Sequence, residues 1–61
     1  MINVLLADDH ALVLEGLRSL LEAEEDMCVV GACADGTAVL EAVRALQPDV
    51  VVLDLQMPAL G

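Results

Sequence analysis

The 61-residue sequence contains no Lys, and Arg18 and Arg44 are its only Arg residues. Eleven acidic residues give a net charge of −9 at pH 7. Binding to nucleic-acid phosphates or to anionic membrane surfaces requires clustered cations. Neither nucleic acid nor a membrane is therefore an expected partner of this segment, whereas a divalent cation or a basic protein surface suits its charge.

Phe, Trp and Tyr are also absent, although 59% of the residues are hydrophobic. The core must therefore consist of Leu, Val, Ala, Met and Ile side chains. A chain of this length can form one small domain, whose core rarely contributes more than roughly 3–5 kcal/mol. The apolar content exceeds what such a unit can easily bury, which favours an incomplete domain or self-association.

Long apolar runs and a basic amino terminus are missing as well. No run approaches the roughly 18–20 residues of a membrane span, and the amino terminus does not resemble a signal peptide, so we expect a cytoplasmic location. Cys28 and Cys33 lie five residues apart in a predicted strand, which would place them on opposite faces. We therefore expect two free thiols, as in a reducing compartment.

The hydrophobic pattern alternates between strand-like and helix-like segments. It predicts strands over Ile2–Ala7, Cys28–Ala34 and Val50–Asp54, and helices over Ala11–Glu24 and Thr37–Gln47. Nearly continuous apolar strands separated by helices are typical of a parallel α/β sheet. Right-handed crossovers would then place the helices.

Helical spacing also predicts which side chains face the core. The expected inward positions are Val13, Leu14, Leu17, Leu20 and Leu21 in the first helix, and Val39, Leu40, Val43 and Leu46 in the second. Asp35-Gly36-Thr37 is expected to form a turn with a helix cap, in which Gly36 adopts a positive φ. Pro48 should end this helix, because the residue before a proline is disfavoured in the helical region.

Carboxylates follow two of the predicted strands. Asp8 and Asp9 come after the first strand, and Asp54 ends the third. If these strands are neighbours, about 4.8 Å apart, the carboxylates lie close together, and two charges 5 Å apart repel by about 3 kcal/mol at an effective dielectric near 20. Such a group requires a cation, and Mg²⁺ suits carboxylate oxygens. An Asp carboxylate can also accept a phosphoryl group.

Each single Asp has a simpler explanation, because Asp is common in solvated turns. The joint pattern is more specific, since it combines Asp8-Asp9, Asp54 and a proline four residues beyond Asp54. Three segments carry a resemblance to a known family: VLLADDHALVLEGLRSLLE, VVGACADGTAVLEAV and QPDVVVLDLQMPALG. The sequence resembles the amino-terminal half of a response-regulator receiver domain from two-component systems, within the NarL/FixJ (LuxR-type) subfamily.

The resemblance implies a flavodoxin-like, doubly wound parallel sheet, truncated to β-α-β-α-β with strand order 2-1-3. It also implies that residues 1–61 lack the remainder of the receiver domain and any DNA-binding effector domain. The family takes a phosphoryl group from a sensor histidine kinase, normally to control transcription. It is a phosphoacceptor signalling domain rather than an enzyme acting on a separate substrate.

The resemblance assigns roles to individual residues. Asp54 matches the phosphoacceptor, and Asp9 matches a direct Mg²⁺ ligand. Asp8 matches the acid that binds the metal mainly through water, and Gln56 matches the residue whose backbone carbonyl completes the protein ligands. His10 belongs to the subfamily's Asp-Asp-His signature, and we expect it to be a helix-start residue near the site rather than a catalytic group.

The sequence also departs from the family pattern. The family's phosphate-binding Ser or Thr follows its fourth strand, its bridging Lys follows the fifth, and its switch aromatic lies on the fifth. None of these three has a counterpart in these 61 residues. An alternative function is therefore an isolated half-domain without phosphotransfer competence. In that case we expect a homodimer through the open edge of the third strand, whose backbone groups and valines offer a template for another strand.

Overall fold

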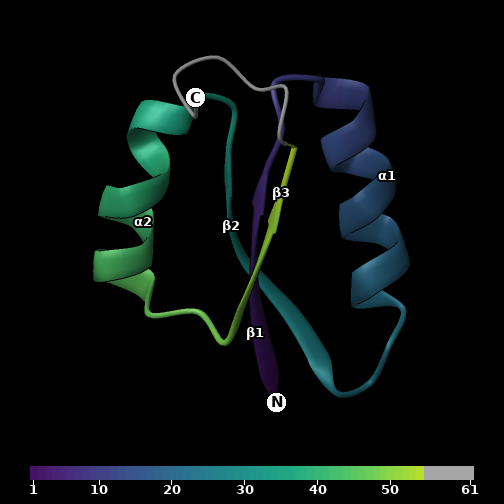
Figure 1. The fold of residues 1–61 in the computed structure, drawn as a ribbon. Helices are drawn as coiled ribbons and strands as arrows, with labels where there is room; N and C mark the ends of the chain where they lie inside the picture. The colour runs from purple at the N-terminus through teal and green to yellow at the C-terminus, as the bar shows by residue number, and fades with distance from the viewer. Residues whose placement is uncertain (55–61) are drawn as a thin grey trace.

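The computed structural model describes residues 1–54 of the chain (Figure 1). Its elements are β1 (Ile2–Ala7), α1 (Ala11–Glu22), β2 (Met27–Cys33), a short 3₁₀ turn (Gly36–Ala38), α2 (Val39–Leu46) and β3 (Val50–Leu53). The predicted alternation of strands and helices is confirmed. Neither of the α-helices in the described part has the length and apolar character needed to cross a bilayer.

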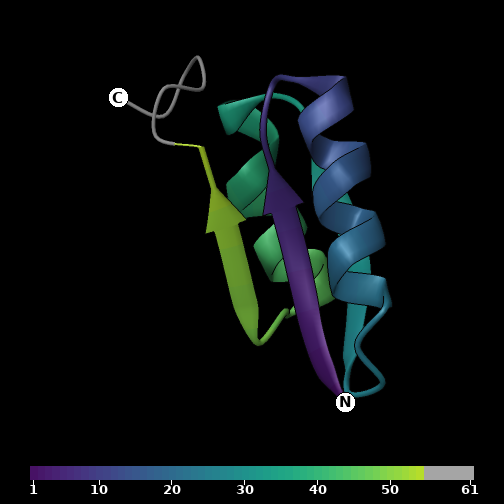
Figure 2. The same cartoon turned by 90° about the vertical axis from the view of Figure 1, so that its right-hand side faces the viewer.

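The three strands form one parallel sheet in the order β2-β1-β3. This order confirms the truncated flavodoxin-like arrangement. Ala7 at the end of β1 pairs with Cys33 on one side and with Leu53 on the other. The carboxyl ends of all three strands therefore meet at one edge, and Figure 2 shows β1 and β3 running side by side toward it.

The two helices cover opposite faces of the sheet (Figure 1). On one face Leu5, Ala7 and Cys33 form a buried cluster against α2. On the other face Val4, Leu6 and Val29 form a second cluster against α1. Side chains alternate between faces along β1, so this central strand contributes to both clusters, and Leu5 and Leu6 are fully buried.

The pairing of β1 with β2 contains a register shift between Val4 and Leu5. Cys28 pairs with Asn3 and Cys33 pairs with Ala7. Because Asn3 and Ala7 lie four residues apart on β1, the two cysteines lie on the same face of the sheet. The predicted opposite orientation is wrong, since a bulge adds one residue and reverses the alternation. Both cysteines are nevertheless free, as expected.

Helix α1 packs on the sheet through a narrower apolar stripe than the sequence pattern predicted. Leu14, Leu17 and Leu21 contact the buried cluster. Val13 and Leu20 are exposed, so their predicted inward placement is wrong. They lie one position before Leu14 and Leu21, which rotates them by about 100° away from the sheet. The helix also ends two residues earlier than predicted, at Glu22.

The second helix begins with a 3₁₀ turn rather than with a regular α-helical turn at Thr37. Asp35 accepts a hydrogen bond from the Thr37 amide at 2.9 Å, which confirms the predicted cap. Positive φ occurs at Gln47 and at no described glycine, so the expectation for Gly36 is wrong. Gln47 ends the helix in the left-handed conformation, directly before Pro48.

The face of α2 that contacts the sheet differs in part from the prediction. Val39 and Val43 pack against the buried cluster, together with Ala42. Leu40 is exposed, so its inward assignment is wrong. Leu46 is also exposed, contrary to its inward assignment, although its Cδ1 would stand 2.8 Å from a Cβ placed on Gly31.

Strand β3 is short and pairs with β1 alone within the described residues. Asp49, directly before β3, exchanges two hydrogen bonds with Asn3: its amide donates to the Asn3 carbonyl at 2.8 Å, and its carboxylate accepts from the Asn3 amide at 2.7 Å. This pair fixes the start of β3 against β1. Val50, Val52 and Leu53 remain exposed.

Candidate functional site

Two backbone hydrogen bonds extend the sheet beyond its regular strands and position the acidic residues. The Asp8 amide donates to the carbonyl of Cys33 at 3.0 Å. The Asp54 amide donates to the carbonyl of Ala7 at 2.9 Å. Because both bonds join neighbouring strands, Asp8 and Asp54 stand next to each other at the carboxyl edge of the sheet.

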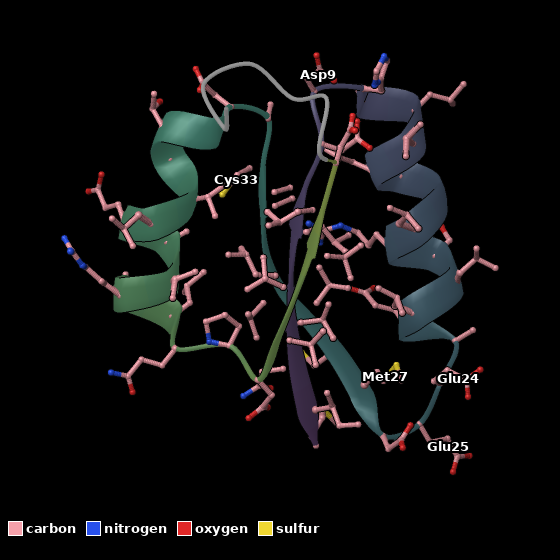
Figure 3. All side chains as sticks on the ribbon, viewed as in Figure 1. Asp9, Glu24, Glu25, Met27 and Cys33 are labelled. Atoms are coloured by element: carbon pink, nitrogen blue, oxygen red, sulfur yellow. The ribbon has the colours of Figure 1, made fainter. Side chains whose placement is uncertain are left out.

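Four side chains gather at this edge, namely those of Asp8, Asp9, His10 and Asp54. One potential ligand atom from each lies within 4.8 Å of the others. Figure 3 shows Asp9 above the end of β1, whereas Glu24 and Glu25 lie at the opposite end of the molecule. The predicted meeting of Asp8, Asp9 and Asp54 is therefore seen, and His10 joins them.

His10 is the residue before α1, and its ring contacts the carboxylates. Its Nδ1 lies 2.9 Å from an oxygen of Asp8, 2.9 Å from an oxygen of Asp9 and 3.9 Å from an oxygen of Asp54. Ionised carboxylates can only accept hydrogen bonds, so Nδ1 carries the proton in this arrangement. The expected position at the helix start is confirmed, but the close contact with all three acids was not predicted.

Asp8 is the most enclosed member of the cluster. Its side chain is 12% exposed, against 67% for His10. The His10 amide donates to Asp8 Oδ1 at 2.8 Å. This backbone hydrogen bond is the main cause that lowers the pKa of Asp8 from its ordinary value, and the His10 ring acts in the same direction, while partial burial opposes both.

The carboxylates change the ionisation of His10 in turn. The hydrogen bond to Asp8 is the largest cause that raises the pKa of His10 above its ordinary value. The negative charges of Asp9, Asp8 and Asp54 act in the same direction, and partial burial opposes them. The cluster therefore favours a positive charge at its centre, which either a protonated imidazole or a bound cation can supply.

Comparison with known proteins identifies the family. The sequence pattern described as the response regulator receiver domain matches residues 4–61. The chain belongs to the receiver domain family. Within this receiver chain, the acidic edge described above lies at the carboxyl ends of β1 and β3, where open parallel sheets place their ligand sites.

Relatives with similar sequences include transcriptional regulatory proteins. The receiver chain is 47% identical over 61 residues to the transcriptional regulatory protein BtsR of Salmonella typhimurium, and this match spans the whole chain and 26% of BtsR. It is 43% identical over 58 residues to the uncharacterized transcriptional regulatory protein YvfU of Bacillus subtilis, which covers 95% of the chain and 29% of YvfU. The chain thus spans about a quarter of the length of these relatives.

Solved structures support the same fold. The response regulator domain of Thermotoga maritima CheB superposes with a TM-score of 0.94 at 38% identity, over 100% of the receiver chain and 46% of the CheB domain. The isolated REC domain of RcsB from Salmonella enterica, determined with the phosphomimetic BeF₃⁻, gives a TM-score of 0.90 at 43% identity. This match covers 95% of the receiver chain and 42% of the RcsB chain.

The predicted site residues divide into two groups. Asp8, Asp9 and Asp54 are brought together as predicted. His10 was expected only near the site, but its side chain belongs to the same cluster. Its position directly after Asp8-Asp9, where the chain turns from β1 into α1, was the available signal. Gln56, which was expected to offer its carbonyl to the metal, lies outside the described residues, as does Pro58.

Proposed function

We propose that residues 1–61 are the amino-terminal half of a receiver domain, in which Asp54 accepts a phosphoryl group from a sensor histidine kinase. The output of the complete protein is control of transcription. The observation that supports this proposal is the clustering of the Asp8, Asp9 and Asp54 carboxylates at one sheet edge. The regulators BtsR and YvfU and the RcsB domain studied with a phosphomimetic support the same function.

The donor set fits Mg²⁺. Asp8, Asp9 and Asp54 offer hard oxygen ligands, and Mg²⁺ is commonly held by one or two carboxylates together with water and phosphate oxygens. These three residues would hold the ion, with the Gln56 carbonyl as a further ligand that the family resemblance implies. When bound, Mg²⁺ supplies positive charge that offsets the carboxylates and the incoming phosphoryl group.

The position of Asp54 supports its proposed role as the nucleophile. Its amide is fixed to Ala7, and its side chain is 22% exposed, so a phosphoryl donor can approach from solvent. In the proposed reaction, an Asp54 carboxylate oxygen attacks phosphorus while the bond from phosphorus to the kinase histidine nitrogen breaks. The imidazole leaves with the bonding electron pair and takes up a proton, and Asp54 becomes an acyl phosphate.

Phosphoryl labelling tests this proposal. In the longer protein that carries this sequence, phosphorylated kinase or acetyl phosphate with Mg²⁺ should label the receiver, and Asp54→Ala should abolish the label. Glu25→Gln, which removes an exposed charge at the opposite end of the molecule, is the matched control and should keep it. Undiminished labelling of Asp54→Ala would refute the assignment.

The 61-residue chain alone should be labelled little under the same conditions. It contains no Lys that could bridge to the phosphoryl group. Thr37 lies within the 3₁₀ turn before α2, and its hydroxyl donates a hydrogen bond to Asp35 Oδ1 at 3.0 Å. Strong labelling of the isolated chain would show that phosphorylation needs neither the family's bridging Lys nor its phosphate-binding Ser or Thr.

A second candidate function is self-association through β3. Within the described residues this strand pairs only with β1, and Val50, Val52 and Leu53 are exposed. Two copies can join their β3 strands around a twofold axis and shield these side chains. Because each copy carries a net charge of −9, added salt should strengthen the dimer by screening the repulsion.

Light scattering of the isolated chain tests this candidate. The expected result is a mass of twice 6.4 kDa that falls to the monomer value in Val52→Lys, because a charge on an edge strand opposes pairing. Leu12→Lys is the matched control, since Leu12 is an exposed apolar residue on α1, away from β3. A folded monomer at millimolar concentration would rule out the homodimer.

A further inference from the structure

Strand β3 leads directly to the proposed phosphoacceptor, but its apolar sequence does not fix its register on β1. The strand consists of the four residues VVVL. A shift by two residues keeps every side chain on the same face of the sheet, because side chains alternate with a period of two. Val52 would then stand where Val50 stands, still facing apolar neighbours. The register of β3 therefore depends on a contact outside the apolar run.

A shift of this size would remove Asp54 from the acidic edge. The rise of a parallel strand is about 3.3 Å per residue, so two residues correspond to about 6.6 Å along β1. In the observed register, potential ligand atoms of Asp8, Asp9 and Asp54 lie within 4.8 Å of one another. The proposed phosphoryl transfer therefore requires this register, in which β1 and β3 run side by side to the same edge (Figure 2).

Asp49 supplies a register-specific contact at the start of the strand. Its carboxylate accepts a hydrogen bond from the Asn3 amide at 2.7 Å, and its own amide donates to the Asn3 carbonyl at 2.8 Å. A shift toward the amino end of β1 would bring Val51 opposite Asn3. The Val51 amide could replace the backbone bond, but its side chain has no acceptor for the other. The reverse shift would bring Pro48, which has no N–H, into the pairing.

We infer that Asp49 is a positioning residue for phosphoryl transfer, because its carboxylate selects the register of β3 that brings Asp54 to Asp8 and Asp9. The inference rests on the proposed function, since it concerns the same phosphoacceptor. Asp49 acts through the strand, from the end of β3 opposite to the acidic edge. Hydrogen bonds to charged groups are among the stronger ones, so one such bond can decide between two registers that place the same kinds of side chain on each face.

NMR of the 61-residue chain tests the register directly, in the unmodified form, in Asp49→Ala and in Asp49→Asn. Both substitutions remove the charge, but Asn keeps an oxygen that can accept from the Asn3 amide. Backbone proton contacts between Val4 and Val50 report the observed register, and contacts between Val4 and Val52 report the shifted one. Asp49→Ala should show the second set, and Asp49→Asn the first alone. Unchanged contacts in Asp49→Ala would overturn the inference.

Mg²⁺ titration of the same three chains links the register to the site. Only chains in the observed register present Asp54 to the ion, so the apparent Kd rises in inverse proportion to their fraction. Loss of a hydrogen bond to a charged group should raise it by about threefold to tenfold in Asp49→Ala. Asp49→Asn, with the same net charge as Asp49→Ala, should bind Mg²⁺ nearly as the unmodified chain does. Equal affinity of Asp49→Ala and Asp49→Asn would contradict the positioning role.

Asp35→Ala separates positioning from a general loss of stability. The Asp35 carboxylate also accepts a backbone hydrogen bond, from the Thr37 amide at 2.9 Å, so this variant loses a comparable bond away from β3. It should keep the contacts of the observed register. A register change in Asp35→Ala equal to that in Asp49→Ala would show that Asp49 acts only through stability, and would refute the inference.

Phosphoryl labelling distinguishes failure of this inference from failure of the proposed function. In a complete receiver domain that contains these 61 residues, Asp49→Ala should be labelled by acetyl phosphate with Mg²⁺ more slowly than the unmodified domain, and Asp49→Asn should restore the rate. Equal rates in all three would refute the positioning role alone. A label that persists in Asp54→Ala would refute the proposed function, whereas the register measured by NMR would be unaffected.

Discussion

The backbone amide of Asp54 donates a hydrogen bond to the carbonyl of Ala7, at an N–O distance of 2.9 Å. This bond continues the pairing of β3 with β1 by one residue beyond Leu53. It places the carboxylate that follows β3 next to Asp8, which follows β1. The proposed phosphoacceptor and its proposed metal ligands are therefore brought together by strand register, and not by a flexible loop.

Metal binding should stabilise the folded chain. Asp8, Asp9 and Asp54 are adjacent only when β1 and β3 are paired, so a divalent cation binds the folded state in preference to the unfolded one. At a free Mg²⁺ concentration of about 100 times Kd, the free energy of unfolding should rise by about 2.7 kcal/mol. Urea denaturation with and without Mg²⁺ measures the effect.

Two variants calibrate that measurement. Asp9→Asn should remove most of the Mg²⁺-dependent stabilisation, since it deletes one proposed ligand. Glu25→Gln should keep it, because Glu25 lies at the opposite end of the molecule. Equal stabilisation of both variants by Mg²⁺ would mean that the ion acts through general charge screening.

The metal-free chain should show a definite pH dependence. The pKa of Asp8 is lowered in the folded state, so its contribution to stability is present above its unfolded value, near 3.9, and is lost as pH falls through the folded pKa. The pKa of His10 is raised, so its contribution is present below about 6.5 and is lost as pH rises through the folded pKa. Both contributions therefore coexist between these two values.

Unfolding experiments in the presence of a chelator, over a range of pH, test this dependence. The free energy of unfolding should decline on the alkaline side as His10 loses its proton, and His10→Asn should remove that decline. NMR titration of the imidazole should give a pKa above the ordinary value in the unmodified chain and a lower one in Asp8→Asn. A His10 pKa that is unaffected by Asp8→Asn would contradict the hydrogen bond.

Substitutions at two glycines should have opposite effects on stability. A Cβ at Gly16 meets nothing within 4 Å, and Gly16 lies inside α1, so Gly16→Ala should stabilise the chain by about 0.5–1 kcal/mol. A Cβ at Gly31 would stand 2.8 Å from Leu46 Cδ1 and 3.3 Å from Leu5 Cδ1. The exposed Leu46 side chain can shift, but Leu5 is fully buried, so Gly31→Ala should destabilise the chain by about 1 kcal/mol. Thermal unfolding followed by circular dichroism measures both, and a gain in Gly31→Ala would show that Leu46 moves aside freely.

The core should tolerate almost no loss of volume. Leu5 is fully buried in the cluster that α2 covers. Leu5→Ala should cost about 2–5 kcal/mol, which is comparable with the whole stability of a core of this size. Far-ultraviolet circular dichroism should show a largely unfolded chain, whereas Leu12→Ala on the exposed side of α1 should remain folded. A folded Leu5→Ala chain would show that the free energy of unfolding is larger than expected for a core of this size.

Sequence periodicity predicted the strand and helix order because the apolar runs of β1 and β3 are short and clearly bounded. It placed Val13, Leu20 and Leu40 incorrectly, since helical spacing alone does not reveal how wide a face the neighbouring sheet covers. The register shift between Val4 and Leu5 lies next to Gly31, and an isolated glycine inside a strand is a signal for a bulge that the prediction did not use. The predicted orientation of Cys28 was therefore wrong.

The candidate site could be predicted in part for a related reason. Carboxylates directly after neighbouring parallel strands must converge, so Asp8 and Asp54 followed from the sequence once the strand order was known. The contact of His10 with both Asp8 and Asp9 depends on the local backbone between β1 and α1. Short-range turn geometry of this kind is not determined by hydrophobic pattern.

The most direct test of the proposed function is to locate the phosphoryl group in a complete receiver domain that contains these 61 residues, after transfer from a histidine kinase. Mass spectrometry of peptides, with the acyl phosphate trapped chemically, identifies the modified residue. We expect a single modified position at Asp54, dependent on a divalent cation and absent from Asp54→Asn. Modification at another residue, or transfer that persists in Asp54→Asn, would contradict it.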